Sequence, residues 1–142
     1  SDMELWILNG CNETLNSFGV FETSEIPIKY INFINEMPNY IELDDFILVH
    51  AGLNFDIENP LEDLTTMLWI RNSIPKKEKI KNKRMIVGHT PKTIDEIVNS
   101  LKTDKITIDG GCCYQHRYSS LGNLVALNID TLEITVQKNI DL

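Results

Sequence analysis

The sequence contains few cysteines and no long apolar run. Its three cysteines, Cys11, Cys112 and Cys113, form no C-x-x-C motif, and their odd number argues against a disulfide scaffold or a zinc finger. This pattern is typical of reduced thiols in the cytosol. No apolar run approaches the roughly 20 residues that a membrane-spanning helix needs, and residues 1–10 do not resemble a signal peptide. We therefore expect a cytoplasmic protein with no membrane partner.

Positive charge is also scarce. The sequence has 13 Lys and Arg residues and 21 Asp and Glu residues, which gives a formal net charge of −8. Nucleic-acid-binding domains usually present a basic surface. The one basic run, from Lys76 to Arg84, is interrupted by Glu78 and by uncharged residues, which is more typical of a solvated loop or helix face. We therefore expect no nucleic-acid partner.

The 142 residues, 42% of them hydrophobic, suffice for one domain with a sizeable core. Apolar periodicity predicts, in chain order, a helix at 28–37, strands at 40–43 and 46–49, a helix after Pro60, a strand at 85–88, a helix at 93–101, a strand at 106–109 and a hairpin of 124–129 and 132–136. Ser24 is the expected N-cap of the first helix, with Pro27 in its first turn. Thr93 and Glu96 resemble a capping box at the start of the helix at 93–101. This order predicts an α/β (α+β) fold whose last strands are antiparallel.

Two of the predicted strands are apolar runs that are directly followed by a histidine. His50 follows residues 46–49, and His89 follows residues 85–88 with Pro91 close behind. Ligands of open α/β sheets bind at the carboxyl ends of the strands, and neutral imidazole is a common metal ligand. Either histidine alone is explained as well by a core position. The pair together indicates a metal site if the two strands are neighbours.

Arg71 directly follows the apolar end of the helix after Pro60. A guanidinium group there needs an anionic partner or access to solvent. A surface arginine at a helix end is one interpretation. The other is an anion-binding group, because guanidinium matches phosphate with two parallel hydrogen bonds. Together with Asp109, which is followed by two glycines, these residues indicate a hydrolytic metal site without specifying its reaction.

Four segments occur in an order and spacing that resemble the later motifs of calcineurin-like metallophosphoesterases. They are residues 46–53 (FILVHAGL), 68–71 (LWIR), 86–91 (IVGHTP) and 108–112 (IDGGC). Residues 6–19 and the ending at 122–131 (GNLVALNIDT) are similar to further segments of this family. The chain most resembles the group of bacterial serine/threonine protein phosphatases and symmetrical bis(5′-nucleosyl)-tetraphosphatases, and the resemblance covers nearly all of it.

The resemblance implies a four-layer αββα sandwich and a phosphatase that uses two divalent metal ions, Mn, Fe or Zn. It implies that His50 and His89 bind one metal and that Arg71, as a catalytic residue, binds the substrate phosphate. An activated water attacks phosphorus in such enzymes. The implied substrates are a phosphorylated protein or a small phosphoester.

The first three motifs of that family, G-D-x-H-G, G-D-x-x-D-R-G and G-N-H-E, do not occur in residues 1–142. We therefore expect these residues to be the C-terminal portion of a single metallophosphoesterase domain, with at most a partial metal site and no activity alone. Three alternatives stay open: a protein phosphatase or general phosphomonoesterase, a dinucleoside tetraphosphatase, and a non-catalytic binding module that keeps the fold.

Loss of the first half of such a sandwich would uncover one face of the remaining sheet. The candidates for that face or its opposite are Ile47, Val49, Ile86, Ile106, Ile108, Leu124 and Ala126. Soluble monomers rarely expose large contiguous apolar surfaces. The sequence therefore predicts that the chain is not a stable monomer by itself: either it pairs with another copy through the uncovered sheet face, or a preceding segment or another chain covers that face.

Overall fold

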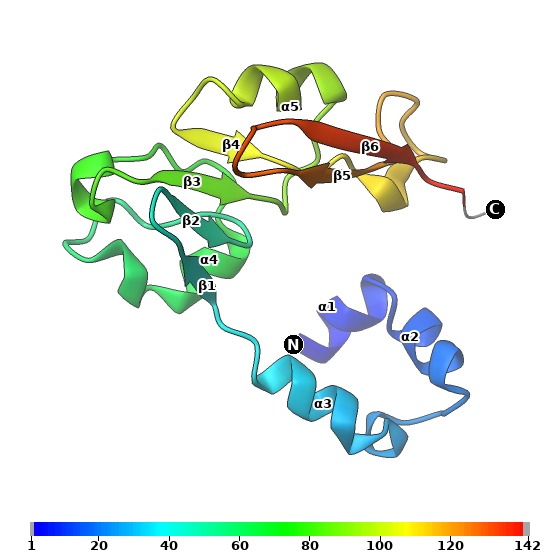
Figure 1. Ribbon diagram of the computed structural model, residues 1–142. Helices are drawn as coiled ribbons and strands as arrows, with labels where there is room; N and C mark the ends of the chain where they lie inside the picture. Colours follow the sequence, from blue (N-terminus) through cyan, green and yellow to red (C-terminus); the bar gives the residue numbers. More distant parts are fainter. Residues whose placement is uncertain (1, 141–142) are drawn as a thin grey trace. The chain divides into compact units, whose positions relative to one another are not determined.

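The computed structural model describes residues 2–140, which form a mixed α/β structure (Figure 1). Their contacts divide the chain at Pro38 into two compact units, residues 1–38 and 39–142. The described residues contain five α-helices, a four-stranded mixed sheet and a two-stranded sheet. None of the described helices is both long and apolar enough to cross a membrane.

The first unit is helical. It contains α1 (Asp2–Leu8), α2 (Cys11–Phe18), a 3-10 helix (Thr23–Glu25) and α3 (Ile28–Asn35). The prediction of α3 is confirmed, but the prediction of Ser24 as its N-cap is wrong, because Pro27 occupies that position. Glu22 and Glu25 form a capping box that organises the separate 3-10 turn around Ser24. The helix α1 was not predicted.

The second unit is built on a four-stranded sheet with the order β1-β2-β3-β4. The strands are β1 (Tyr40–Glu42), β2 (Phe46–Val49), β3 (Arg84–Val87) and β4 (Lys105–Thr107). β1 runs antiparallel to β2, whereas β2, β3 and β4 are parallel. The two strands that precede the histidines are therefore neighbours, with Val49 paired with Val87.

The connections between the parallel strands contain α4 (Leu64–Trp69) and α5 (Ile94–Ser100). The helix predicted after Pro60 is split into a 3-10 turn (Pro60–Glu62) and α4. The split occurs at Asp63, because its side chain accepts a hydrogen bond from the Thr66 amide and so begins a new helix. For α5 the predicted capping box of Thr93 and Glu96 is confirmed.

The hydrophobic core lies on one face of the sheet. Its members are Ile47, Val49, Leu53, Phe55, Met67, Ile80, Met85 and Val87. Met67 brings α4 to this face, and α5 lies on the same face, because the hydroxyl of Thr107, paired with Val87, is 3.4 Å from that of Ser100. Of the residues predicted for an uncovered face or its opposite, Ile47 and Val49 thus belong to the helix-covered core.

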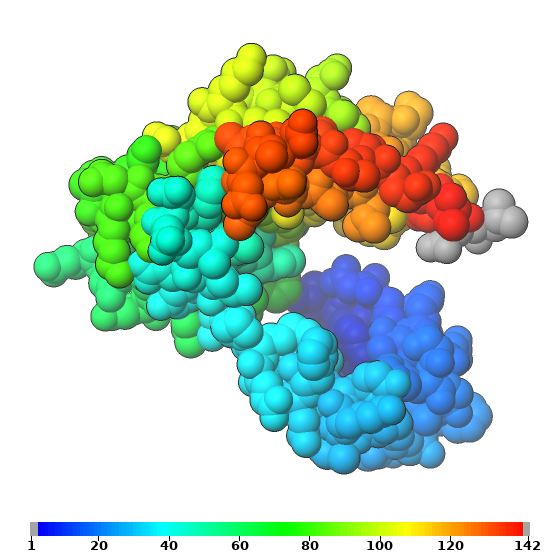
Figure 2. Space-filling model, in the orientation of Figure 1, coloured from blue at the N-terminus to red at the C-terminus, as the bar shows by residue number. Residues whose placement is uncertain are grey.

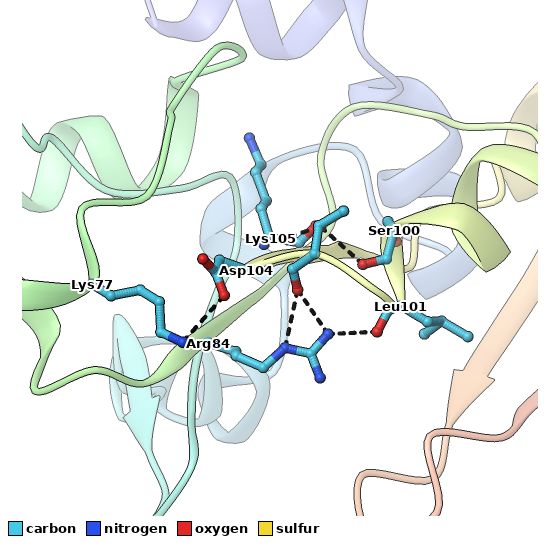
Figure 3. Close-up of polar contacts among 7 residues, drawn as sticks. Lys77, Arg84, Ser100, Leu101, Asp104 and Lys105 are labelled. Carbon is cyan, nitrogen blue, oxygen red and sulfur yellow. Dashed lines mark hydrogen bonds and ion pairs between the residues drawn. The ribbon is translucent and has the colours of Figure 1, made fainter.

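Arg84 ties the turn between α5 and β4 to the neighbouring strand (Figure 3). Its guanidinium donates to the carbonyl of Leu101 over 2.6 Å and to that of Thr103 over 2.7 and 3.0 Å. Beside it, Lys77 forms an ion pair of 3.2 Å with Asp104. These contacts satisfy carbonyls at the end of α5 and fix the start of β4.

The predicted C-terminal hairpin is confirmed as β5 (Asn123–Leu127) and β6 (Ile134–Lys138). Much of it lies at the surface (Figure 2). Val125 is buried, whereas Leu124 is 62% exposed. On the sheet face opposite the helices, Ile86 and Ile106 are buried but Ile41 is 47% exposed.

Candidate metal and phosphate site

His50 and His89 meet at the carboxyl edge of the sheet. His50 directly follows β2, and His89 lies two residues after β3. The Gly88 amide donates to the His50 carbonyl over 2.8 Å, so the parallel ladder extends past both strands. The Nε2 atom of His50 lies 3.0 Å from the Nδ1 atom of His89. The predicted approach of the two rings is therefore confirmed.

The backbone of His89 adopts a conformation that residues other than glycine rarely take. Its φ is +64°, and the Thr90 amide donates to the Gly88 carbonyl over 2.7 Å, which closes a three-residue γ-turn. Such a conformation costs on the order of 1–3 kcal/mol and persists only where the surrounding structure imposes it. The strain falls on the residue that carries one of the two paired rings, a feature that the sequence did not reveal.

The environment of His89 favours its neutral form. Burial lowers the pKa of His89, and the nearby His50 and Arg71 lower it further. The carboxylate of Asp109 and the carbonyl of Trp69 act in the opposite direction without reversing the shift. Nε2 of His89 is buried and makes no hydrogen bond of good geometry with the described residues. A neutral imidazole binds metals through its unprotonated nitrogen, and the nitrogen of His89 that faces His50 is Nδ1.

The third residue predicted for the site is Arg71. It follows α4 by two residues and is exposed. Its positive charge is close enough to lower the pKa of His89. The ring centroid of Trp69, two residues before Arg71, is 6.1 Å from that of His89, with the planes perpendicular. The structure therefore brings the two histidines into contact and places Arg71 near enough for its charge to act on His89.

Asp109, which precedes two glycines and was counted toward a hydrolytic site in the sequence without a specific role, is a further charged group at this edge. It follows β4, the third parallel strand, and the Ile108 amide donates to the Val87 carbonyl. A Cβ atom placed on Gly88 would lie 3.9 Å from that of Asp109. One carboxylate oxygen accepts a 2.8 Å hydrogen bond from the Gly111 amide. The signal in the sequence was its position, at a strand end beside a histidine-bearing strand.

The two imidazoles fit part of a metal site. Two nitrogens that bind one ion at about 2.0–2.1 Å each lie roughly 3 Å apart, close to the separation found here. Within residues 2–140, no group of three or more His, Cys, Asp and Glu side chains is arranged to hold a metal. The third histidine, His116, lies in the 115–122 loop, where its Nε2 is 3.4 Å from Nε2 of Gln115. The described residues therefore offer two ligands.

Comparisons with known proteins do not assign the chain to a family. No family model matches the sequence. Searches of curated proteins and of solved structures likewise found no match. The interpretation of the site therefore depends on its own geometry and on the motifs in the sequence.

Proposed function

We propose that this chain is the C-terminal part of a metal-dependent phosphoesterase that hydrolyses phosphomonoesters. The observation that carries the proposal is the 3.0 Å separation of His50 Nε2 and His89 Nδ1 at the carboxyl edge of the sheet. The charge of Arg71 acts on His89 at the same edge. Imidazoles suit a borderline divalent ion such as Zn, Mn or Fe, and guanidinium suits phosphate oxygens. The substrates would be a phosphorylated protein or a small phosphoester in the cytoplasm.

In this proposal each residue has one role. His50 and His89 hold a divalent ion through the two facing nitrogens, and Arg71 binds and orients the phosphate group of the substrate. The ion would supply a water of lowered pKa as the nucleophile. Asp109 places negative charge beside the pair, which favours a cation there. The other ligands of a two-metal centre would come from outside residues 1–142.

The sheet supports the corresponding architecture, a four-layer αββα sandwich. Both α4 and α5 cover the Val49 and Val87 face. The opposite face carries Ile41, which is 47% exposed and would pack against a second sheet. Ile86 and Ile106 lie on the same face but are already buried by the described residues. Stacked sheets interdigitate apolar side chains in this way.

The test is whether the chain binds a divalent metal ion and, with the metal present, phosphate. We expect the purified chain to bind Mn²⁺ and, with Mn²⁺ present, to bind inorganic phosphate, both measured by calorimetry. Arg71→Ala should retain Mn²⁺ binding and weaken phosphate binding, because only the guanidinium is removed. Arg117→Ala is the matched control, since Arg117 lies beside the ring of Tyr118 in the 115–122 loop. A chain that binds neither Mn²⁺ nor phosphate would refute the proposal.

We expect residues 1–142 alone not to hydrolyse an aryl phosphate at an enzymatic rate, because two histidines do not complete a dinuclear centre. The measurement is release of aryl alcohol with Mn²⁺ or Zn²⁺ added, compared with His89→Ala. Metal-dependent turnover by the wild-type chain that His89→Ala abolishes would show that the site is complete as it stands.

A further inference from the structure

The segment that carries Arg71 is packed tightly against the loop that carries His50. A Cβ atom built on Gly52 would lie 2.6 Å from Oγ of Ser73 and 2.9 Å from Cγ2 of Ile70. Real Cβ atoms do not approach other atoms this closely, so only glycine fits at position 52. Ile70 and Ser73 flank Arg71 in sequence, and Gly52 follows His50 by two residues.

The place of Ser73 is explained by this packing rather than by hydrogen bonding of its side chain. Ser73 is 7% exposed, and its Oγ is buried without a hydrogen-bond partner among the described residues. A buried hydroxyl without a hydrogen-bond partner is destabilising, so hydrogen bonding of this side chain does not account for a serine at position 73. Its carbonyl, by contrast, accepts a 3.3 Å hydrogen bond from Nζ of Lys105 in β4. Ser73 is thus held from two sides, by the loop after β2 and by the edge strand.

The same loop is tied to α4 one residue earlier, where the Ala51 amide donates to the Met67 carbonyl over 2.8 Å. The side chain of Arg71 itself makes no hydrogen bond or ion pair with the residues between 2 and 140. Its position therefore depends on the backbone of residues 70–73, and that backbone depends on the contacts around Gly52.

We infer that Gly52, Ile70, Ser73 and Lys105 form a clamp that fixes the backbone of Arg71 against the loop that follows His50, which makes Gly52 and Ser73 positioning residues for anion binding. The inference rests on the proposed function for the role of Arg71 in binding phosphate. The clamp itself does not depend on that role. When the backbone of Arg71 is already fixed, its guanidinium can bind a tetrahedral anion without the entropy cost of ordering the segment that carries it.

The first test is Gly52→Ala, which inserts a methyl group into the contact with Ser73. We expect the segment to be displaced and loosened. The NMR order parameter of the Asn72 amide should fall from about 0.85, typical of rigid backbone, to below about 0.6. Phosphate affinity in the presence of Mn²⁺ should weaken at least about tenfold, because small misplacements of a binding group have large effects. Mn²⁺ affinity should not change, since the clamp leaves His50 and His89 in place.

Two further variants cover the case in which Gly52→Ala fails to fold. Lys105→Met keeps the apolar stem of the side chain but removes the bond to the Ser73 carbonyl, so it should loosen residues 70–73 in a folded protein. Lys102→Met, an exposed lysine nearby, is its control. In a folded Gly52→Ala background, Ser73→Ala removes the atom at 2.6 Å and should restore part of the order and of the phosphate affinity.

The outcomes separate the clamp from the function of the site. Unchanged order at Asn72 in both Gly52→Ala and Lys105→Met would overturn the clamp, whatever the chain binds. Loosening with unchanged phosphate affinity would overturn its positioning role. If the wild-type chain binds no phosphate at all, the proposed function fails and the positioning role fails with it, whereas the order parameters still decide whether the clamp exists.

Discussion

The Gly88 amide donates a hydrogen bond to the His50 carbonyl over 2.8 Å, one step beyond the last paired residues of β2 and β3. The sheet ladder itself therefore sets the spacing of the two histidine-bearing backbones. Sites built on strands are held more precisely than sites on free loops. The rings then come within 3.0 Å because the γ-turn at His89 directs its side chain back toward His50.

The first prediction concerns the metal ligands. His89→Ala should lower Mn²⁺ or Zn²⁺ affinity by more than about 100-fold, because loss of a ligand exceeds the tenfold to hundredfold effect of losing its outer-shell support. His116→Ala should leave the affinity unchanged, since His116 lies in the 115–122 loop. Calorimetric titration of the three proteins measures the difference. Equal losses in both variants would contradict the assignment of the site.

The second prediction follows from the lowered pKa of His89, which burial causes first and His50 and Arg71 reinforce. In the unfolded chain His89 takes up a proton near its ordinary pKa of about 6.5, whereas the folded chain takes it up only at lower pH. The unfolded state therefore binds more protons in that window, and stability falls as the pH drops through it.

The measurement is the midpoint of thermal unfolding from pH 7.5 to pH 5 with a chelator present. Other groups also titrate in this range, so the comparison is with His89→Gln, which has no titrating ring. We expect the wild type to lose more stability toward pH 5 than the variant does. Parallel curves for the two proteins would show that the pKa of His89 is not lowered by folding.

The third prediction concerns the turn that Arg84 holds. Arg84→Met should destabilise the second unit by about 1–2 kcal/mol, because it leaves the carbonyls of Leu101 and Thr103 without their charged donor. Lys102→Met removes an exposed charge from the same turn and should change stability by less than about 0.5 kcal/mol. Urea unfolding of both variants gives the two values. A loss no larger than that of the control would mean that solvent replaces the bonds of Arg84.

The sequence predicted the parts of the fold that local patterns determine. Apolar runs located all six strands, and Thr93 with Glu96 located the start of α5. The site depends on β2 and β3 being neighbours. This adjacency was assumed as a condition and was not predicted from the sequence. Strand order is decided by packing between segments far apart in the chain, and no local pattern records it.

Other features lay beyond the sequence for the same reason. The strain at His89 arises from its surroundings, since nothing in the local pattern favours a positive φ there. Ser73 resembles any loop serine until its contact with Gly52 is visible. The list of residues for an uncovered sheet face mixed two faces, because alternation does not reveal which side the helices cover. Ile47 and Val49 pack under the helices, whereas Ile86 and Ile106 lie on the other face, where both are buried.

The last prediction is that the purified chain associates with itself through apolar surface on its strands. Ile41 of β1 and Leu124 of β5 are 47% and 62% exposed, and Val136 of β6 is 40% exposed. β1 is also an edge strand with unpaired backbone groups, which favours pairing with another chain. Burial of such surface gains about 25 cal/mol per Å², so several exposed side chains together favour a dimer.

Sedimentation at a series of concentrations measures this association. Ile41→Lys and Leu124→Lys should each shift the equilibrium toward monomer, because a lysine at the contact must be desolvated. Ile74→Lys is the control, since Ile74 is 82% exposed but lies in the loop after α4 rather than on a strand. If the wild type is a cooperatively unfolding monomer that binds no hydrophobic dye, the second unit is self-contained and its exposed strand residues have no partner. If instead all three variants weaken association equally, the contact is nonspecific rather than a surface formed by β1 and β5.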